Sequence, residues 1–247
     1  TRLTRFSSSM THIPRFGIPA GRIRLRLGSW RGRTQMPRAK YTSNKRPRLS
    51  EEEDEECGVE LEKVVRQIDN RVYFHACVSR HSILLLIEKL HAAEKAALTM
   101  SPRAADAFVM LFIHSEGGDA YAGLSGMNHI QTMRVPVVTI SDGFVASAAT
   151  FLLLGGVRRY AMEHSCVLIH QVSSTFWGKY MELQDEMQNS TQLMLVLKKL
   201  YRLKTSMSTK KLEGMLKKER TLTAKECIRN GIVDAVFTPS EFGPKLS

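Results

Sequence analysis

The first 50 residues of this 247-residue chain contain no aspartate or glutamate, although they carry 13 lysines and arginines. Residues 51–56, EEEDEE, reverse this imbalance with six acids and no base. This part of the chain has few aliphatic side chains and no sustained hydrophobic period, so it lacks what a packed core requires. We expect a disordered arm over 1–60, first basic and then acidic. The positive net charge of the chain, +12, is concentrated in residues 1–50.

Several functions fit the charge of this arm. An acid-free start rich in arginine and serine is typical of an organelle transit peptide. The stretch NKRPRLSEEEDEE (44–56) is similar to a basic nuclear signal beside an acidic block. Residues 1–50 also suit contact with nucleic acid or another polyanion through charge alone. A solvated tail without a partner is an equal alternative, and the sequence leaves the choice open.

Cysteine is scarce, and its spacing excludes several classes of protein. The four cysteines are far apart, with no CxxC pair and no Cys–His pair at zinc-ligand spacing: Cys57, Cys77, Cys166 and Cys227. We therefore expect free thiols in a reducing intracellular compartment, either the cytoplasm or an organelle matrix. No apolar run reaches 18 residues, which predicts no membrane span. Without a phosphate-binding glycine-rich loop or a metal motif, we expect this chain to bind no cofactor and no metal.

The remainder of the chain, with a hydrophobic content of 43% over the whole sequence, indicates alternating strands and helices. The expected strands are 71–78, 107–115, 135–143 and 166–172, and the expected helices are 81–98, 120–134, one from about 147, 179–206 and 209–218. A turn over 157–165 and a short α/β unit over 223–237 complete the pattern. This alternation favours a mainly parallel sheet with right-handed crossovers. We expect one domain over 61–240 and a short tail over 241–247.

A single hydroxyl, Ser147, interrupts the small and apolar residues of GFVASAATFLL (143–153). A serine among alanines is often a packing residue. Here it stands where a buried strand ends and a helix begins, beside backbone N–H groups that can hold an oxyanion. The amide of Ala148 is the natural first donor. Gly118 of SEGGD (115–119) can supply a second, although two glycines also suit an ordinary tight turn.

A serine nucleophile needs a base within hydrogen-bond reach. Among eight histidines, His170 ends the apolar strand CVLIHQV, at the sheet edge where the Ser147 helix begins. A third group must orient the imidazole. Five acids are candidates for that role, and their spacing does not choose between them: Asp142, Glu163, Asp185, Glu219 and Asp234.

The ordered set SEGGD, VASAATFLL, VLIHQ and ERTLTAKECIRNGIVD resembles the proteolytic subunit of the Clp protease, ClpP. Typical members have SPGG, a serine motif containing ASM, MIHQP, and a motif of an acid, two further residues and then LTAxEAxxxGLVD. The resemblance covers about residues 64–237. The separations of 29 residues from Gly118 to Ser147 and 49 from His170 to Glu219 fit the family, whereas the 23 from Ser147 to His170 are about two short.

The resemblance implies an α/β fold of the ClpP–crotonase type, a spiral of ββα units. It also implies that Ser147 attacks the peptide carbonyl and that His170 takes its proton. Glu219 falls where the family has an aspartate that orients the imidazole. The N–H groups of Gly118 and Ala148 would hold the oxyanion.

The sequence departs from the family beside the site. After the histidine, the family's proline and paired glycines are replaced by Val172, Ser174 and Thr175. These replacements fall in the expected substrate-handle strand, whose backbone pairs with substrate in the family: Val172, Ser173, Ser174 and Thr175. Lys217 and Lys218 replace an acid–arginine pair that joins two rings. Glu116 replaces the proline of SPGG. These changes weaken the expectation of a double ring more than that of the fold.

The function implied by the resemblance is a serine endopeptidase that cuts unfolded peptides inside a ring chamber. In the family, seven subunits form a ring, two rings stack, and a Clp-type ATPase feeds the chamber, so ATP belongs to the partner unfoldase. One alternative is a catalytically silent Clp-like subunit with a role in assembly. Another is a crotonase-type acyl-CoA enzyme, which shares the fold.

Overall fold

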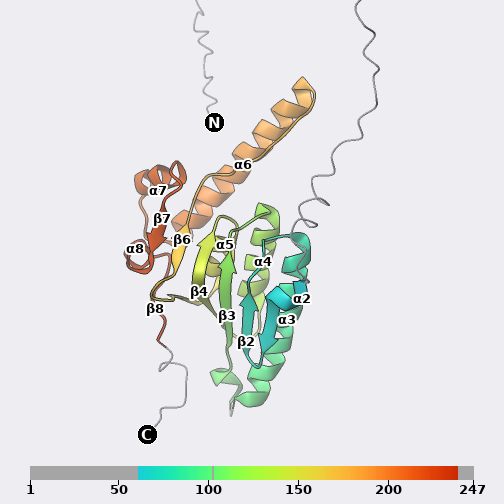
Figure 1. Ribbon diagram of the computed structural model, residues 1–247, viewed down its shortest axis with the longest axis vertical. Coiled ribbons are helices and arrows are strands. Elements are labelled where there is room, and N and C mark those ends of the chain that lie inside the picture. The colour runs from blue at the N-terminus through green and yellow to red at the C-terminus, as the bar shows by residue number, and fades with distance from the viewer. Residues whose placement is uncertain (1–60, 102, 239–247) are drawn as a thin grey trace, which may run out of the picture. The chain divides into compact units, whose positions relative to one another are not determined.

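The computed structural model describes residues 61–101 and 103–238, which form helices around one mainly parallel sheet (Figure 1). The sheet has the order β1-β2-β3-β4-β5-β8, and β6 pairs with both β4 and β7. The pairs β1–β2 and β6–β7 are antiparallel, and the other pairs are parallel. The expected arm over 1–60 and tail over 241–247 lie outside the described residues, so the predictions about them stay predictions.

The strands are β1 (Val65–Ile68), β2 (Arg71–Phe74), β3 (Val109–Ser115), β4 (Val137–Ala146), β5 (Arg158–Ala161), β6 (Cys166–Leu168), β7 (Thr221–Thr223) and β8 (Ala235–Val236). The helices are α2 (Leu61–Val64), α3 (Arg80–Met100), α4 (Ala120–Thr132), α5 (Ala149–Gly155), α6 (Tyr180–Lys204), α7 (Thr209–Leu216) and α8 (Ala224–Arg229), with a 3-10 turn at Ala104–Asp106. The predicted alternation is found. The segment expected as a turn, 157–165, contains β5, and the strand expected over 166–172 ends at Leu168.

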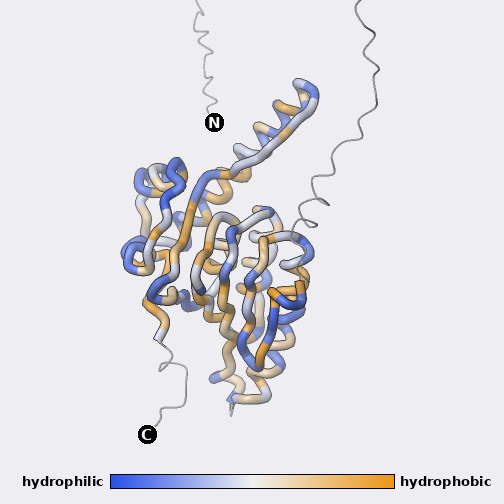
Figure 2. Tube along the Cα trace, viewed as in Figure 1, coloured by the Kyte–Doolittle hydropathy of each residue, from blue (hydrophilic) through white to orange (hydrophobic). Residues whose placement is uncertain are grey.

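The central strand β3 is buried on both faces, as its nearly continuous apolar sequence predicts. Val109, Leu111 and Ile113 face the larger core. Met110 and Phe112 belong to a separate cluster. This division follows the two-residue period of a strand, which sends successive side chains to opposite faces. Figure 2 shows the apolar residues along the central strands and an alternation of apolar and polar residues along α6.

The long strand β4 changes partners along its length, and this change positions the end of the strand. Residues 138–141 pair with β5, whereas residues 144–146 pair with β6. Gly143 lies between these two segments with φ +89°, and a Cβ there would be 2.5 Å from Nδ1 of His114. The switch continues β4 beyond its pairing with β5 and delivers the next residue, Ser147, to the edge formed with β6.

Three of the four cysteines lie in the described part of the chain, and all three are free thiols: Cys77, Cys166 and Cys227. The free-thiol prediction is confirmed for these three. Burial raises the pKa of the Cys227 thiol to about 12. This thiol is therefore protonated at neutral pH and is a packing group, because the thiolate is the reactive form.

A buried carboxylate joins α3 to the connection between α4 and β4. The Glu94 side chain is only 4% exposed. It accepts a hydrogen bond from the Arg134 backbone N–H at 2.9 Å and from its Nη2 at 3.1 Å. Burial alone would raise the pKa of Glu94, but the hydrogen bonds and charge of Arg134 outweigh it and leave that pKa below its usual value.

We expect Glu94→Gln to lower the free energy of unfolding by about 1–3 kcal/mol at neutral pH, because the hydrogen bonds from Arg134 to this buried side chain lose their charge assistance. A depressed pKa stabilises the fold above the pKa of the unfolded chain, about 4.3. The difference between wild type and variant should therefore shrink as the pH falls below that value. Urea unfolding at a fixed protein concentration measures both effects. Glu88→Gln, which changes an exposed carboxylate on the same helix, is the control. An equal loss of unfolding free energy in the two variants would contradict the stabilising role assigned to Glu94.

Candidate active site

Ser147 occupies the turn between the end of β4 and the start of α5. Its φ is +52°, and Asp69 is the only other non-glycine residue of the described chain with a positive φ. This left-handed backbone is costly for a residue with a Cβ, and such strained residues cluster at functional sites, where the surrounding structure enforces them. The serine selected by sequence is therefore the strained residue at the strand–helix junction.

Three hydrogen bonds hold this turn. The Ser147 N–H donates to the carbonyl of Leu168 at 3.0 Å. The Ser147 carbonyl accepts from the Thr150 N–H at 3.0 Å and from the Thr150 hydroxyl at 2.6 Å. Because Leu168 precedes His170 by two residues, the first bond also keeps the serine close to the segment that carries the histidine.

Two glycines pack against this turn where no side chain fits. A Cβ on Gly117 would lie 2.6 Å from the Cβ of Ser147, and a Cβ on Gly118 would lie 2.3 Å from the carbonyl oxygen of Val78. Their φ angles are +101° and +140°. Bonds from the Val78 N–H to the Gly117 carbonyl and from the Asp119 N–H to the Val78 carbonyl, 2.7 and 2.8 Å long, fix this loop. The loop thus needs glycine for both space and backbone angle.

Two backbone donors remain beside the serine. Within the described residues, the N–H groups of Gly118 and Ala148 donate to no protein acceptor. Both residues line the same cleft as Ser147. A free N–H pair next to a strained hydroxyl is the arrangement that an oxyanion requires, provided that both groups point at the reacting carbonyl.

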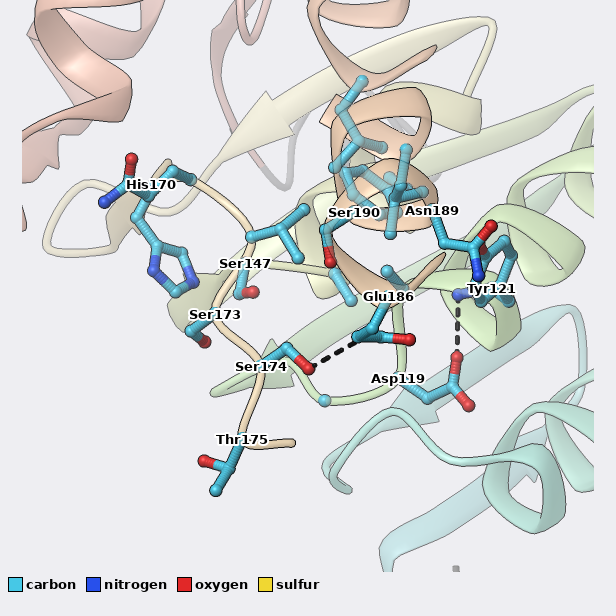
Figure 3. A pocket seen from close by; sticks show the side chains of 18 of the residues that line it. Asp119, Tyr121, Ser147, His170, Ser173, Ser174, Thr175, Glu186, Asn189 and Ser190 are labelled. Atoms are coloured by element: carbon cyan, nitrogen blue, oxygen red, sulfur yellow. Dashed lines mark hydrogen bonds between the residues drawn. The ribbon is translucent and has the colours of Figure 1, made fainter. Parts of the chain in front are cut away.

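The cleft has a volume of about 730 Å³. Its walls are the Gly118 turn, the Ser147 turn, residues 170–175 and residues 186–201 of α6. Figure 3 shows the Ser147 hydroxyl and the His170 imidazole on the same side of this cleft. Among the described residues no hydrogen bond joins these two side chains, and such contacts are often long before substrate binds.

Glu219 lies outside the cleft and its side chain is exposed. The antiparallel ladder between β6 and β7 pairs Cys166 with Thr223 and Leu168 with Thr221. The ladder ends at Leu168 and Thr221, and the same register extended by two residues would bring His170 opposite Glu219. The Gln171 N–H, which donates to the carbonyl of Leu216 at 3.0 Å, keeps the two segments together just beyond this point. The structure thus places the acid on the neighbouring segment, without a hydrogen bond to the imidazole.

Two of the other candidate acids have partners elsewhere. Asp234 binds Arg159 with a carboxylate–guanidinium distance of 2.8 Å. Asp142 lies 3.4 Å from Nε2 of His75. Glu163 and Asp185 are exposed and do not line the cleft. Among the five acids, Glu219 is the one on the segment that leads into β7, the strand paired with β6.

Comparison with known proteins identifies the family of this chain. A model of the Clp protease family matches residues 87–240. The chain belongs to the Clp protease family. An ATP-dependent Clp protease proteolytic subunit of Ostreococcus tauri is 34% identical over 143 residues, which cover 57% of this chain and 72% of the relative. A protein of the same name from Cyanophora paradoxa is 29% identical over 187 residues, or 74% of this chain and 93% of the relative.

The predicted family is confirmed, and so is the predicted class of fold, an α/β domain of the ClpP type. The family also agrees with the predicted class of activity, that of a Clp-type serine peptidase, which requires no cofactor of its own. In the described part of this Clp family chain, no group of three or more potential ligands is placed to hold a metal ion. No described helix is both long and apolar enough to cross a membrane.

The Clp family motifs did not reveal the contribution of α6 to the cleft. The sequence predicted only a helix over this segment, yet Glu186, Asn189 and Ser190 line the cleft together with Ser147. Figure 3 shows these residues along the α6 side of the cleft. The available signal was a run of polar residues, DEMQNS (185–190), in a helix otherwise rich in methionine and leucine.

A series of buried hydrogen bonds also links α6 to the Ser147 turn. The Tyr201 hydroxyl lies 2.6 Å from the Thr150 hydroxyl. The single hydroxyl proton of Thr150 is donated to the Ser147 carbonyl, so Tyr201 must donate to Thr150. Complete burial raises the pKa of Tyr201, which keeps it protonated as this donor role requires. These hydrogen bonds from Tyr201 through Thr150 stabilise the strained Ser147 turn.

Proposed function

We propose that this Clp family chain is a serine endopeptidase subunit that cleaves unfolded polypeptides, with Ser147 as nucleophile, His170 as base and Glu219 as the acid that orients the base. The observation that carries the proposal is the strained Ser147 turn, which lies in one cleft with His170 and with the free N–H groups of Gly118 and Ala148. Strain, base and oxyanion donors together are characteristic of an acyl-transfer site.

The reaction follows from these positions. The Ser147 Oγ attacks the peptide carbonyl as its proton passes to the His170 imidazole, and the N–H groups of Gly118 and Ala148 bind the resulting oxyanion. The tetrahedral intermediate collapses when the imidazolium returns the proton to the leaving amine, which frees one peptide and leaves an acyl-serine ester. Water, deprotonated by His170, then attacks the ester and releases the second peptide.

The segment after His170 supports a role as the substrate handle. Residues 172–175 have no helix or strand assigned, and the described structure gives the N–H groups of Ser173, Ser174 and Thr175 no acceptor. Val172 instead donates to the sulfur of Met194 at 3.2 Å. An extended substrate could use the free edge by adding a strand to it, a mode in which main-chain bonds supply affinity without sequence preference.

Apolar side chains exposed around the start of α6 support assembly. Trp177 is 88% exposed, and Tyr180, Met181 and Met187 are each more than 60% exposed. In Figure 1 this helix projects beyond the sheet. Exposed apolar surface of this kind marks a protein interface. Membership of the Clp family implies ring assembly and a Clp-type ATPase partner in general. We propose that subunits form heptameric rings, which can stack as a double ring, and that the partner uses the ATP.

The arm and the compartment are not tested by the described residues. Contact of residues 1–50 with polyanions stays a prediction, as does location in the cytoplasm or an organelle matrix.

A fluorophosphonate probe tests the proposed nucleophile directly. We expect the probe to label the assembled protein at one residue, identified by peptide mass spectrometry as Ser147, because the reagent requires an activated serine and an oxyanion site. Prior incubation with an unfolded peptide substrate should slow labelling. Labelling at another serine, or none in material shown to be a ring, would overturn the proposal.

One observation favours a second candidate, a catalytically silent Clp subunit that serves assembly. Within the described chain Glu219 makes no hydrogen bond to His170, so the imidazole lacks the partner that normally fixes its orientation. The same fluorophosphonate experiment separates the two functions, since a silent subunit would assemble and remain unlabelled.

A further inference from the structure

The α6 side of the cleft carries a negative charge without a cationic partner. Glu186 is half-buried, and its Oε1 lies 3.4 Å from the Ser174 hydroxyl, a long and weak contact. Figure 3 shows this carboxylate pointing into the cleft beside the handle segment. In the described structure Glu186 forms no ion pair, and no lysine or arginine lines the cleft. The charge therefore faces the space that a substrate would occupy.

The other carboxylate that lines the cleft has a structural role. Asp119 caps the N-terminus of α4, where its Oδ1 accepts the Tyr121 and Ala122 N–H groups at 2.7 and 3.0 Å. These bonds satisfy the carboxylate and bind it to its own helix. It reinforces the negative potential of the cleft, but Glu186 is the acid left free to pair with a ligand.

Part of the cleft lining is apolar. Phe151, Leu193 and Leu197 line the cleft, and each of these side chains is less than 10% exposed. A lysine or arginine side chain has a long aliphatic stem and a charged head, so it can lie along an apolar floor while its charge reaches a carboxylate at the rim. A glutamate side chain in the same place would meet like charge.

We propose that Glu186 gives this peptidase a preference for lysine or arginine at the substrate residue that precedes the scissile bond. This inference rests on the proposed function, because it takes Ser147 as the reacting group of the same cleft. The pair is partly solvated, so the preference is of moderate size: about 5- to 30-fold in kcat/KM for arginine over an uncharged side chain of similar length. Salt should reduce it by screening.

The test uses three fluorogenic peptides that differ only at that residue, which is arginine, norleucine or glutamate. We expect wild type to have the highest kcat/KM for the arginine peptide, a lower value for the norleucine peptide and the lowest for the glutamate peptide. Glu186→Gln should bring the arginine and norleucine peptides within about twofold of each other, and Glu186→Arg should favour the glutamate peptide. Asp185→Asn is the matched control, because it removes the same charge from an exposed neighbour that does not line the cleft. It should keep the wild-type order.

Fluorophosphonate labelling of the same samples separates this inference from the proposed function. Labelled enzyme that prefers norleucine, or whose preference is equal in wild type and Glu186→Gln, would overturn the role of Glu186 while the nucleophile stands. Absence of labelling would overturn the function itself. Binding of the three peptides to Ser147→Ala, followed by fluorescence anisotropy with and without Glu186→Gln, measures the same preference without turnover. An equal affinity for all three peptides there would also contradict the inference.

Discussion

Alanine in place of Ser147 or His170 is expected to lower kcat/KM for an unstructured peptide by about 10⁴-fold or more. Without the Ser147 Oγ no acyl-enzyme can form, and without the His170 imidazole the hydroxyl keeps its proton. The effects of the two substitutions on the activation free energy should not be additive. A double variant should be about as slow as either single one, because each change alone disables the same step. The residual rate should come from the oxyanion donors and from substrate binding.

The matched controls are Ser125→Ala and His129→Ala, which change an exposed serine and an exposed histidine on α4. Initial rates below KM give kcat/KM, and sedimentation shows whether each variant still assembles. Controls close to wild type, beside inactive but assembled Ser147 and His170 variants, would establish the pair. Activity kept in Ser147→Ala would exclude it as nucleophile, whatever its backbone strain.

Long apolar segments made most of the fold predictable from the sequence. The nearly continuous apolar run in β3 predicted a strand buried on both faces, and the structure has the side chains of Met110 and Leu111 in different clusters. β5 was missed because RRYA carries two arginines, of which Arg159 is satisfied by Asp234 75 residues later. That compensation comes from tertiary contacts, which no local pattern contains.

The dependence on tertiary contacts also decides which residues of the site could be predicted from the sequence. Ser147, Gly118 and Ala148 belong to short motifs whose chemistry is local, since a strand end, a glycine turn and a helix start are adjacent to them. His170 required the further assumption that its strand lies beside the serine turn, and the bond from Ser147 to Leu168 supplies that placement. Glu186 was missed because its importance depends on how α6 lies across the cleft.

Removal of the Glu219 carboxylate should have the second largest effect. We expect Glu219→Ala and Glu219→Gln to lower kcat/KM by about 10³- to 10⁴-fold, because an imidazole without an acidic partner adopts the wrong tautomer and gains no stabilisation when it takes the serine proton. The predicted contact requires the Glu219 side chain to reach His170 from the segment that precedes β7, beyond the end of the β6–β7 ladder. Substrate bound along the handle would complete that closure by ordering the segment after His170.

Glu219→Asp distinguishes this positioning role from a purely structural one. Aspartate keeps the charge and shortens the side chain by one methylene, and we expect it to retain activity within about tenfold of wild type. Rescue by aspartate but not by glutamine assigns the effect to the carboxylate charge. Glu163→Ala, which removes an exposed acid between β5 and β6, should leave the rate unchanged. If Glu219→Ala remained as active as wild type, Ser147 and His170 would form a dyad, and the acid at this position would be a surface residue.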